Sequence, residues 1–278
     1  MTAPSPHQPI AKICPECNTA LIDKYCHACG ERPADAHDLS LKHFIGHGVH
    51  ELTHFDSKIF RTLKTLVFAP GMLTADYLAG RKKRYVPPLR LYLVIFAISF
   101  FLYTRPGVSL YDVRVFNAAA YTRGNANGLE KNLESAAEQK HISKEALYER
   151  FNEHWQHDVS LFQLGDVIVF ALILAAVNWR RYMVEHLIFS LHTLSFAFFY
   201  ECVMWLYYAR FGFRQNLPLI GIFMLVMFLY IWRALPRVYP TSAWKTVLKA
   251  AVLVVGLEFA RLFFLSFTLT LAAYQTVN

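Results

Sequence analysis

The sequence predicts an all-α integral membrane helical bundle of about five transmembrane helices, preceded by a small zinc-ribbon-like knuckle. Hydrophobic residues make up 55% of the 278 positions and charged residues only 17%, a balance typical of chains that reside in lipid. Long apolar segments fill the second half of the chain, and two Cys-x-x-Cys pairs lie near its start. We therefore expect residues 1–36 to form a head, residues 37–88 an amphipathic connector with a basic cluster, and residues 89–278 the transmembrane bundle.

The head is predicted to bind a structural zinc ion. Two Cys-x-x-Cys pairs can place four thiolates around one tetrahedral ion, which suits Zn²⁺ in a reducing compartment. The predicted ligands are the cysteines of these pairs, Cys14, Cys17, Cys26 and Cys29. Asn18 and Gly30, each directly after a pair, suit the positive-φ turns of such a knuckle. Iron in the same cage is an alternative, since ligand type alone does not separate the two metals. Two disulfides would instead require an exported head.

Five apolar segments are predicted to cross the membrane, since a span takes about 17 to 25 residues. In chain order they are Leu89–Tyr103, Leu161–Asn178, Leu187–Tyr208, Leu217–Leu235 and Val247–Tyr274. The first is the shortest and follows two prolines. Between the first two spans, residues 104–160 are predicted to form an external helical cap, with charged helices at Leu129–Gln139 and Lys144–His157.

Basic residues beside these spans predict the orientation of the bundle. Clusters before the first span, between the second and third, and between the fourth and fifth all fall on one side if five spans alternate. Because cytoplasmic loops are enriched in lysine and arginine, that side should be the cytoplasm. We expect a multi-pass protein of the bacterial inner (cytoplasmic) membrane with its N-terminus in the cytoplasm. The net charge of +8 then reflects topology and anionic lipid headgroups, and no nucleic acid partner is expected.

The connector is predicted to form an amphipathic helix. Apolar residues recur at helical spacing from Leu41 to Leu66, so this helix should lie on the bilayer or pack under the bundle. On its opposite side, His50, Glu51 and His54 match the H-E-x-x-H pattern of zinc peptidases. A membrane zinc peptidase is a distant alternative, because a catalytic zinc also needs a third protein ligand and a shaped cleft. No residue is therefore assigned a catalytic role.

A basic cluster follows the connector helices. Pro70-Gly71 should break the first helix, and Gly80 fits a C-terminal cap of the next one. The cluster comprises Arg81, Lys82, Lys83 and Arg84. Cations at this position favour both the helix carboxyl end and anionic lipid headgroups. We expect the cluster to contact headgroups, to act as a topology signal, or both.

The order of these features resembles a known family. Asp56, Thr62–Leu66, Pro70-Gly71, the run Asp76–Val86 and Pro87-Pro88 follow one another behind the four-cysteine head. Taken together they resemble a bacterial family of uncharacterised multi-span membrane proteins known only as a domain of unknown function. The resemblance covers roughly the first hundred residues. It implies a zinc-ribbon-like head on an inner-membrane helical bundle, and it implies no activity.

Ionisable residues also fall within the predicted spans, where a charged group costs at least ~2.5 kcal/mol unless it finds a partner or water. The candidate intramembrane charge site comprises Asp166, Glu201, Glu258 and Arg261. Glu258 and Arg261 lie three residues apart on one helix and can pair. Glu201 and Asp166 should lie at similar depth and could share Arg261 or a proton. We consider these residues the best candidates for a substrate or ion path.

The sequence thus predicts a non-enzymatic scaffold or regulator whose zinc-binding head recruits a cytosolic protein partner, because a closed four-cysteine site leaves no open position for catalysis. A small-solute or ion transporter or channel that uses the intramembrane charges is the alternative. The lipid bilayer, with its anionic headgroups, is the other expected partner.

Overall fold

The computed structural model describes residues 13–14, 17–22, 26–30, 58–103, 133, 135–139, 141–211 and 219–277. Every regular element within these ranges is a helix, which confirms the all-α class for the described residues. In chain order they are α2 (Lys58–Phe68), α3 (Met72–Leu78), α4 (Pro88–Tyr103), α7 (Lys144–Val177), α8 (Met183–Phe211), α9 (Leu219–Val238) and α10 (Ala243–Val277). In the head, an isolated antiparallel bridge joins Ile13 to Ala20.

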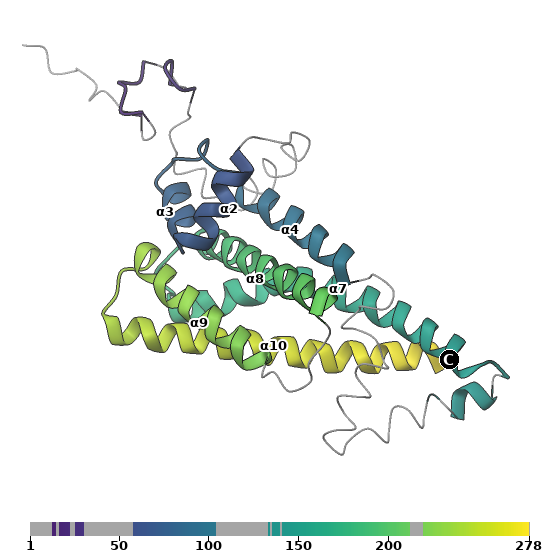
Figure 1. The fold of residues 1–278 in the computed structure, drawn as a ribbon. Coiled ribbons are helices and arrows are strands. Elements are labelled where there is room, and N and C mark those ends of the chain that lie inside the picture. The colour runs from purple at the N-terminus through teal and green to yellow at the C-terminus, as the bar shows by residue number, and fades with distance from the viewer. Residues whose placement is uncertain are drawn as a thin grey trace, which may run out of the picture.

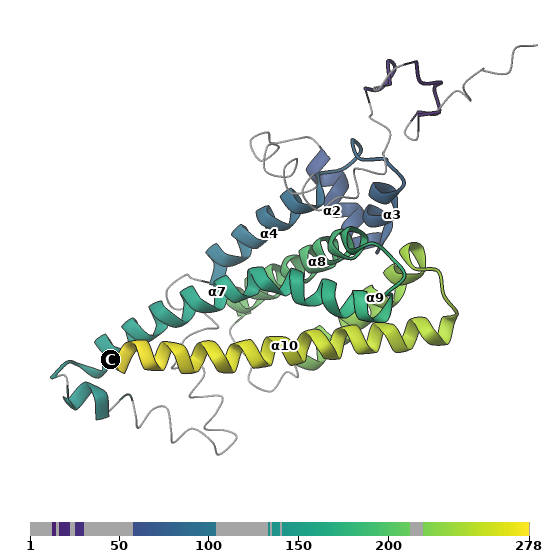
Figure 2. The ribbon, with the colours of Figure 1, turned by 180° about the vertical axis from the view of Figure 1, so that it is seen from behind.

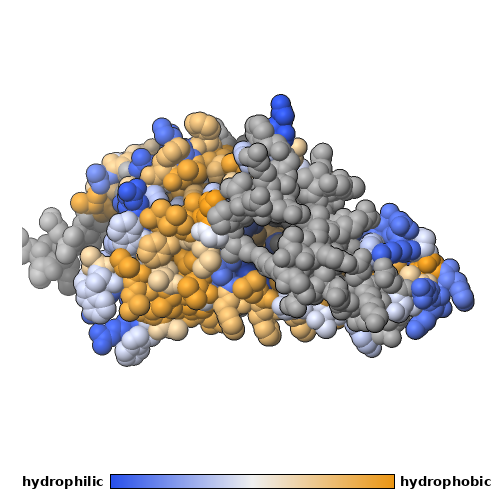
Figure 3. Space-filling view, turned by 60° about the horizontal axis from the view of Figure 1, so that its bottom comes forward, coloured by the Kyte–Doolittle hydropathy of each residue, from blue (hydrophilic) through white to orange (hydrophobic). Residues whose placement is uncertain are grey.

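Within the described ranges, four helices are long and apolar enough to cross a membrane, namely α7, α8, α9 and α10. They coincide with the last four predicted spans. The first predicted span coincides with α4, whose 16 residues extend for about 24 Å at 1.5 Å per residue. This length is shorter than the roughly 30 Å of a bilayer's hydrocarbon core. Figure 3 shows an apolar belt between hydrophilic ends on one face of the molecule.

The head and the C-terminus lie at opposite ends of the bundle (Figures 1 and 2). Helix α4 begins at the head end, whereas α7 begins beside the C-terminus. The next three helices then alternate in direction. Because α4 falls short of a spanning length, the prediction of five crossings stays a prediction, and four candidate spans are what the described residues contain.

Helices α7 and α10 are longer than a bilayer requires. They contain 34 and 35 residues, about 50 Å each, and pack along one another (Figure 2). The predicted break between a cap helix ending at His157 and a span beginning at Leu161 is wrong, because α7 is continuous. No glycine or proline interrupts residues 158–160, so nothing in the chain opposes continuation of the helix.

The described residues form two hydrophobic cores that hold the bundle together. The main core joins α2, α3 and α4 to α7, α8, α9 and α10, with Phe170, Leu194 and Ile231 fully buried. A second core lies at the far end, where Phe151 and Trp155 of α7 pack with Leu133 and Ala272. The first half of α7 and the end of α10 therefore pack in a core of their own, and an external cap at this end stays a prediction.

Helices α2 and α3 pack under the bundle, one of the two placements that the sequence allowed. Leu66 and Leu73 are buried in the main core. Gly71 has φ 80° and lies so close to α9 that an added Cβ would stand 2.6 Å from the carbonyl oxygen of Ala234. Only glycine fits both the left-handed backbone and this approach. A neighbouring carbonyl, that of Pro70, accepts a hydrogen bond from Arg237.

Candidate functional site

The four predicted zinc ligands lie together in the head. Their Sγ atoms are all within 4.8 Å of one another, and none is in a disulfide. The Sγ atoms of Cys14 and Cys29 are 3.6 Å apart, and those of Cys17 and Cys26 are 3.5 Å apart. Zinc–sulfur bonds of about 2.3 Å in a tetrahedron place sulfur atoms about 3.8 Å apart. The spacing therefore fits a four-thiolate metal site, with each close pair joining the two knuckles.

Tight turns hold each knuckle in shape. Asn18 donates its backbone N–H to the carbonyl of Cys14 at 3.0 Å, and Gly30 donates to that of Cys26 at 2.6 Å. Both residues have positive φ, 58° for Asn18 and 67° for Gly30, which confirms the predicted turns. These bonds curl the chain back after each pair so that both sulfur atoms of a pair face the same point.

Hydrogen bonds with Thr19 favour the ionised form of the exposed Cys17 thiol. The hydroxyl oxygen of Thr19 lies 3.2 Å from its Sγ. Hydrogen bonds from the side chain and backbone of Thr19 lower the pKa of Cys17 from 9.0 to about 6. The thiolate, which is the form that binds metal, is therefore favoured at neutral pH.

Members of the basic cluster make two kinds of contact, with polar acceptors and with aromatic rings. Arg81 pairs with the buried carboxylate of Asp76, and Lys83 donates to the carbonyl oxygen of Gly30 in the head. Lys82 and Arg84 lie over the rings of nearby tyrosines. Two members of the cluster thus fasten the head end of the structure, and contact with lipid remains a prediction for the cluster as a whole.

Gly80 caps α3 as predicted. It has φ 86° and donates to the carbonyl of Tyr77 at 3.1 Å, while Arg81 donates to that of Asp76 at 2.9 Å. This pair of bonds is a Schellman motif. It directs the chain away from α3 and brings the Arg81 side chain back onto Asp76.

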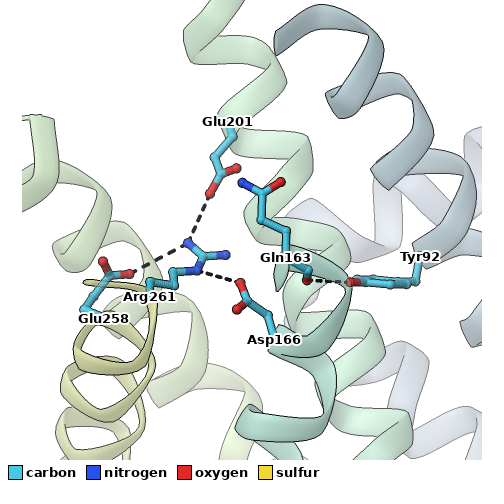
Figure 4. Close-up of polar contacts among 6 residues, drawn as sticks. All are labelled: Tyr92, Gln163, Asp166, Glu201, Glu258 and Arg261. Carbon is cyan, nitrogen blue, oxygen red and sulfur yellow. Dashed lines mark hydrogen bonds and ion pairs between the residues drawn. The ribbon is translucent and has the colours of Figure 1, made fainter. Parts of the chain in front are cut away.

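The four intramembrane residues named from the sequence converge in the bundle (Figure 4). Arg261 of α10 donates from Nε to Asp166 of α7 at 2.9 Å and from Nη1 to Glu201 of α8 at 3.1 Å. Glu258, one turn before it on α10, lies 3.8 Å from Nη1. One guanidinium therefore joins three helices through three carboxylates, and we call this group the Arg261 quartet.

Charges in the Arg261 quartet do not balance. A single guanidinium faces three carboxyl groups, and like charges this close disfavour full ionisation of all three. Asp166 is only 2% exposed, so solvent offers it little compensation. Atom Nη2 of Arg261 is buried and has no hydrogen-bond partner among the residues that the structure describes. The rings of Phe198 and Phe223 flank the guanidinium, with centroids 6.0 and 5.5 Å away, and keep the quartet in an apolar setting.

Sequence reasoning missed other buried polar pairs at the head end. Thr74 and the buried His192 of α8 lie 2.9 Å apart, and His186 contacts the Tyr239 hydroxyl at 2.9 Å. The Asp76–Arg81 pair also went unpredicted, although an acid followed five residues later by arginine across a glycine cap was a usable signal. His50, Glu51 and His54 of the peptidase pattern lie outside the described residues.

Comparison with protein families finds a match over part of the chain. A family model described as "Protein of unknown function (DUF3667)" matches residues 56–100, which include α2, α3 and most of α4. No curated protein and no solved structure matches the chain. The match agrees with the resemblance seen in the sequence over this segment. It includes neither the cysteine cluster nor the Arg261 quartet.

Proposed function

We propose that this protein is a membrane-embedded zinc-binding scaffold or regulator, whose head recruits a cytosolic partner to the bilayer. The observation that carries the proposal is the convergence of the four cysteine Sγ atoms within 4.8 Å. Four thiolates complete a tetrahedral zinc site and leave no position for substrate or water, which is the arrangement of structural rather than catalytic zinc. A small fold stabilised by metal is a common way to present a protein-binding surface without a large core.

The contact between head and bundle supports this role. Lys83 lies in the loop between α3 and α4 and donates to Gly30, directly after the last cysteine. Through this bond the metal-binding head is held at the surface of the bundle. A partner bound to the head would therefore be kept beside the membrane.

The orientation supports a cytoplasmic head. The end of α9 lies at the head end, since Arg237 contacts Pro70. Helix α8 also contacts α3 there through Thr74 and His192, and Arg180 and Arg181 immediately precede α8. Basic residues thus gather at the end of the bundle that carries the head. The positive-inside rule favours the cytoplasm for that end in an inner-membrane protein.

Metal analysis of the full-length protein tests the first half of the proposal. We expect about one zinc per chain after purification from membranes. The double variant Cys14→Ser/Cys29→Ser should lose the metal and still insert, because the helices pack through the separate main core. Cys202→Ser, a change in the buried free cysteine of α8, is the matched control and should keep the metal. Stoichiometric iron, or a metal-free chain with linked thiols, would contradict a zinc site.

Crosslinking in intact cells tests the second half. A protein captured by the wild-type chain and by Cys202→Ser, but not by the zinc-free double variant, would support recruitment. Equal capture by all three chains would show that the head does not select the partner.

A second candidate function is proton or ion transport, and the Arg261 quartet favours it. Among the described residues, the four cysteines form the one group of His, Cys, Asp and Glu side chains whose ligand atoms converge as a metal site would require. The three carboxylates instead surround a fixed guanidinium. A proton suits this arrangement better than a divalent cation, because it needs one carboxylate oxygen rather than several.

Flux measurements in proteoliposomes test this candidate. Glu258→Gln should abolish proton flux while the protein stays folded, since the amide keeps the shape of the side chain and cannot take up and release a proton as a carboxyl group does. Glu145→Gln changes an exposed acid in the first turn of α7 and should leave flux unchanged. Absence of flux in the wild-type protein would remove the transporter candidate and leave the scaffold.

A further inference from the structure

Helix α2 has two faces of different character. Thr62 and Leu66 are buried, and Leu63 packs against the main core. On the other side, Phe60 and Phe68 are each 80% exposed. At 100° per residue, Phe60, Lys64 and Phe68 form a line opposite Thr62 and Leu66. With the neighbouring exposed Arg61, these three residues make up what we call the outer face of α2.

The outer face lies where the chain enters the bundle. Thr62 on the inner side of α2 accepts a hydrogen bond from the backbone N–H of Val86 at 3.0 Å. Val86 comes two residues before α4 begins at Pro88. Because α4 is apolar, a bilayer that surrounds α4 would place α2 at the level where lipid gives way to water.

Other exposed aromatic residues support a position of this end of the bundle in the headgroup region. Trp179 and Tyr182 between α7 and α8, and Trp244 at the start of α10, are 77%, 66% and 65% exposed. Arg180 and Lys245 lie over the rings of Trp179 and Trp244. Exposed tryptophan and tyrosine beside cations are typical of the headgroup region. Phe60 and Phe68 beside Arg61 and Lys64 on α2 repeat this combination of exposed rings and cations.

We propose that the outer face of α2 inserts among the headgroups of an anionic lipid leaflet, with Phe60 and Phe68 at the acyl boundary and Arg61 and Lys64 at the phosphates. Charge complementarity supports lipid as the occupant, since α2 contains cations and no acid. The two rings are about 12 Å apart along the helix, with a lysine between them. Separate rings beside cations suit an interfacial helix, whereas a protein-binding hot spot would gather them into one pocket.

Photocrosslinking of the full-length protein in nanodiscs tests the inference. Benzoylphenylalanine is placed at Phe60 or at Phe68, in nanodiscs of phosphatidylcholine alone or of an equal mixture with phosphatidylglycerol. Both positions should form phospholipid adducts, with phosphatidylglycerol enriched over its share of the mixture. The control position is Ile22, which is 84% exposed on the head and should capture no lipid.

Removing the cations tests the headgroup preference separately. Arg61→Gln/Lys64→Gln should lower the ratio of phosphatidylglycerol adducts to phosphatidylcholine adducts by about five-fold per cation removed, while adduct formation continues through the rings. The matched control is Arg150→Gln/Lys144→Gln at the far end of α7, which should leave the enrichment unchanged. A polypeptide adduct at Phe60 or Phe68 would overturn the proposal in favour of a protein partner or a second copy. Lipid adducts without headgroup preference would overturn the anionic part.

Discussion

Nε of Arg261 lies 2.9 Å from Oδ2 of Asp166, and this bond joins the last helix of the bundle to α7 across a separation of 95 positions in the chain. The same guanidinium reaches Glu201 on α8. Three of the four long helices therefore meet at one side chain. In an apolar setting such a contact acts on both stability and helix register.

Replacing Arg261 with methionine should destabilise the bundle by about 3–5 kcal/mol, because the buried carboxyl group of Asp166 and the half-buried ones of Glu201 and Glu258 would lose their cation. Unfolding in a detergent–lipid mixture, followed by loss of helical circular dichroism, measures the change. Phe259→Leu, at a position 73% exposed on the same helix, should change the free energy of unfolding by less than about 0.5 kcal/mol. Equal effects of the two variants would mean that the quartet contributes nothing to stability.

Gly71→Ala should destabilise the packing of α3 on α9 by about 1–3 kcal/mol, since the new Cβ would combine a strained positive φ with a close approach to the Ala234 carbonyl. Gly165 of α7 supplies the contrast, because an added Cβ there meets nothing within 4 Å. Gly165→Ala should therefore stabilise the protein by about 0.5–1 kcal/mol. Opposite signs in thermal unfolding are the expected result, and a common sign would contradict the described approach of α3 to α9.

Chelation of the metal should unfold the head and leave the bundle intact. The two knuckles of the head are held together at the four cysteines, whereas the main core lies in residues 58–103 and the long helices. After treatment with a strong chelator, the peptide Cys26–Gly30 should exchange its amide hydrogens rapidly, while peptides from α8 keep their protection. Loss of protection in α8 would show that the two parts do not fold independently.

Lys83→Gln should loosen the head from the bundle, because it weakens the bond that Lys83 donates to the Gly30 carbonyl. A single charge-assisted hydrogen bond at an exposed site contributes about 1 kcal/mol, so exchange at Gly30 should rise a few-fold in the metal-loaded protein. Lys82→Gln, next along the chain with its Nζ over Tyr77, is the control and should leave exchange at Gly30 unchanged. The same rise in both variants would point to a general effect of charge.

The arrangement of helices in the bundle was largely predictable, and the details at their ends were not. Apolar runs located α4, α8, α9 and α10 because a bilayer demands a minimum apolar length. The continuity of α7 was missed, since a change from charged to apolar composition looks like a boundary even where the backbone has no reason to stop. Hydropathy indicates whether a helix is surrounded by lipid or by water. The ends of a helix are indicated instead by glycine, proline and capping residues.

The candidate sites, too, were predicted in part from the sequence and in part not. Cysteine spacing placed all four sulfur atoms, because a metal site constrains short-range geometry strongly. The grouping of the Arg261 quartet was predicted because a charged residue in a span needs a partner, and the predicted spans contain few ionisable residues. The pairing of Thr74 with His192 could not be foreseen, since it depends on how α3 docks onto α8. No local pattern encodes a contact between residues 118 positions apart.

The continuous course of α7 has a mechanical consequence. A continuous helix moves as one body, so a tilt or rotation of the half of α7 in the main core must also move Phe151 and Trp155 in the second core. Helix α10 runs alongside and ends in the same second core through Ala272. Because Arg261 joins these two helices between the cores, a change in the ionisation of its neighbours would shift both helices and so reach the second core.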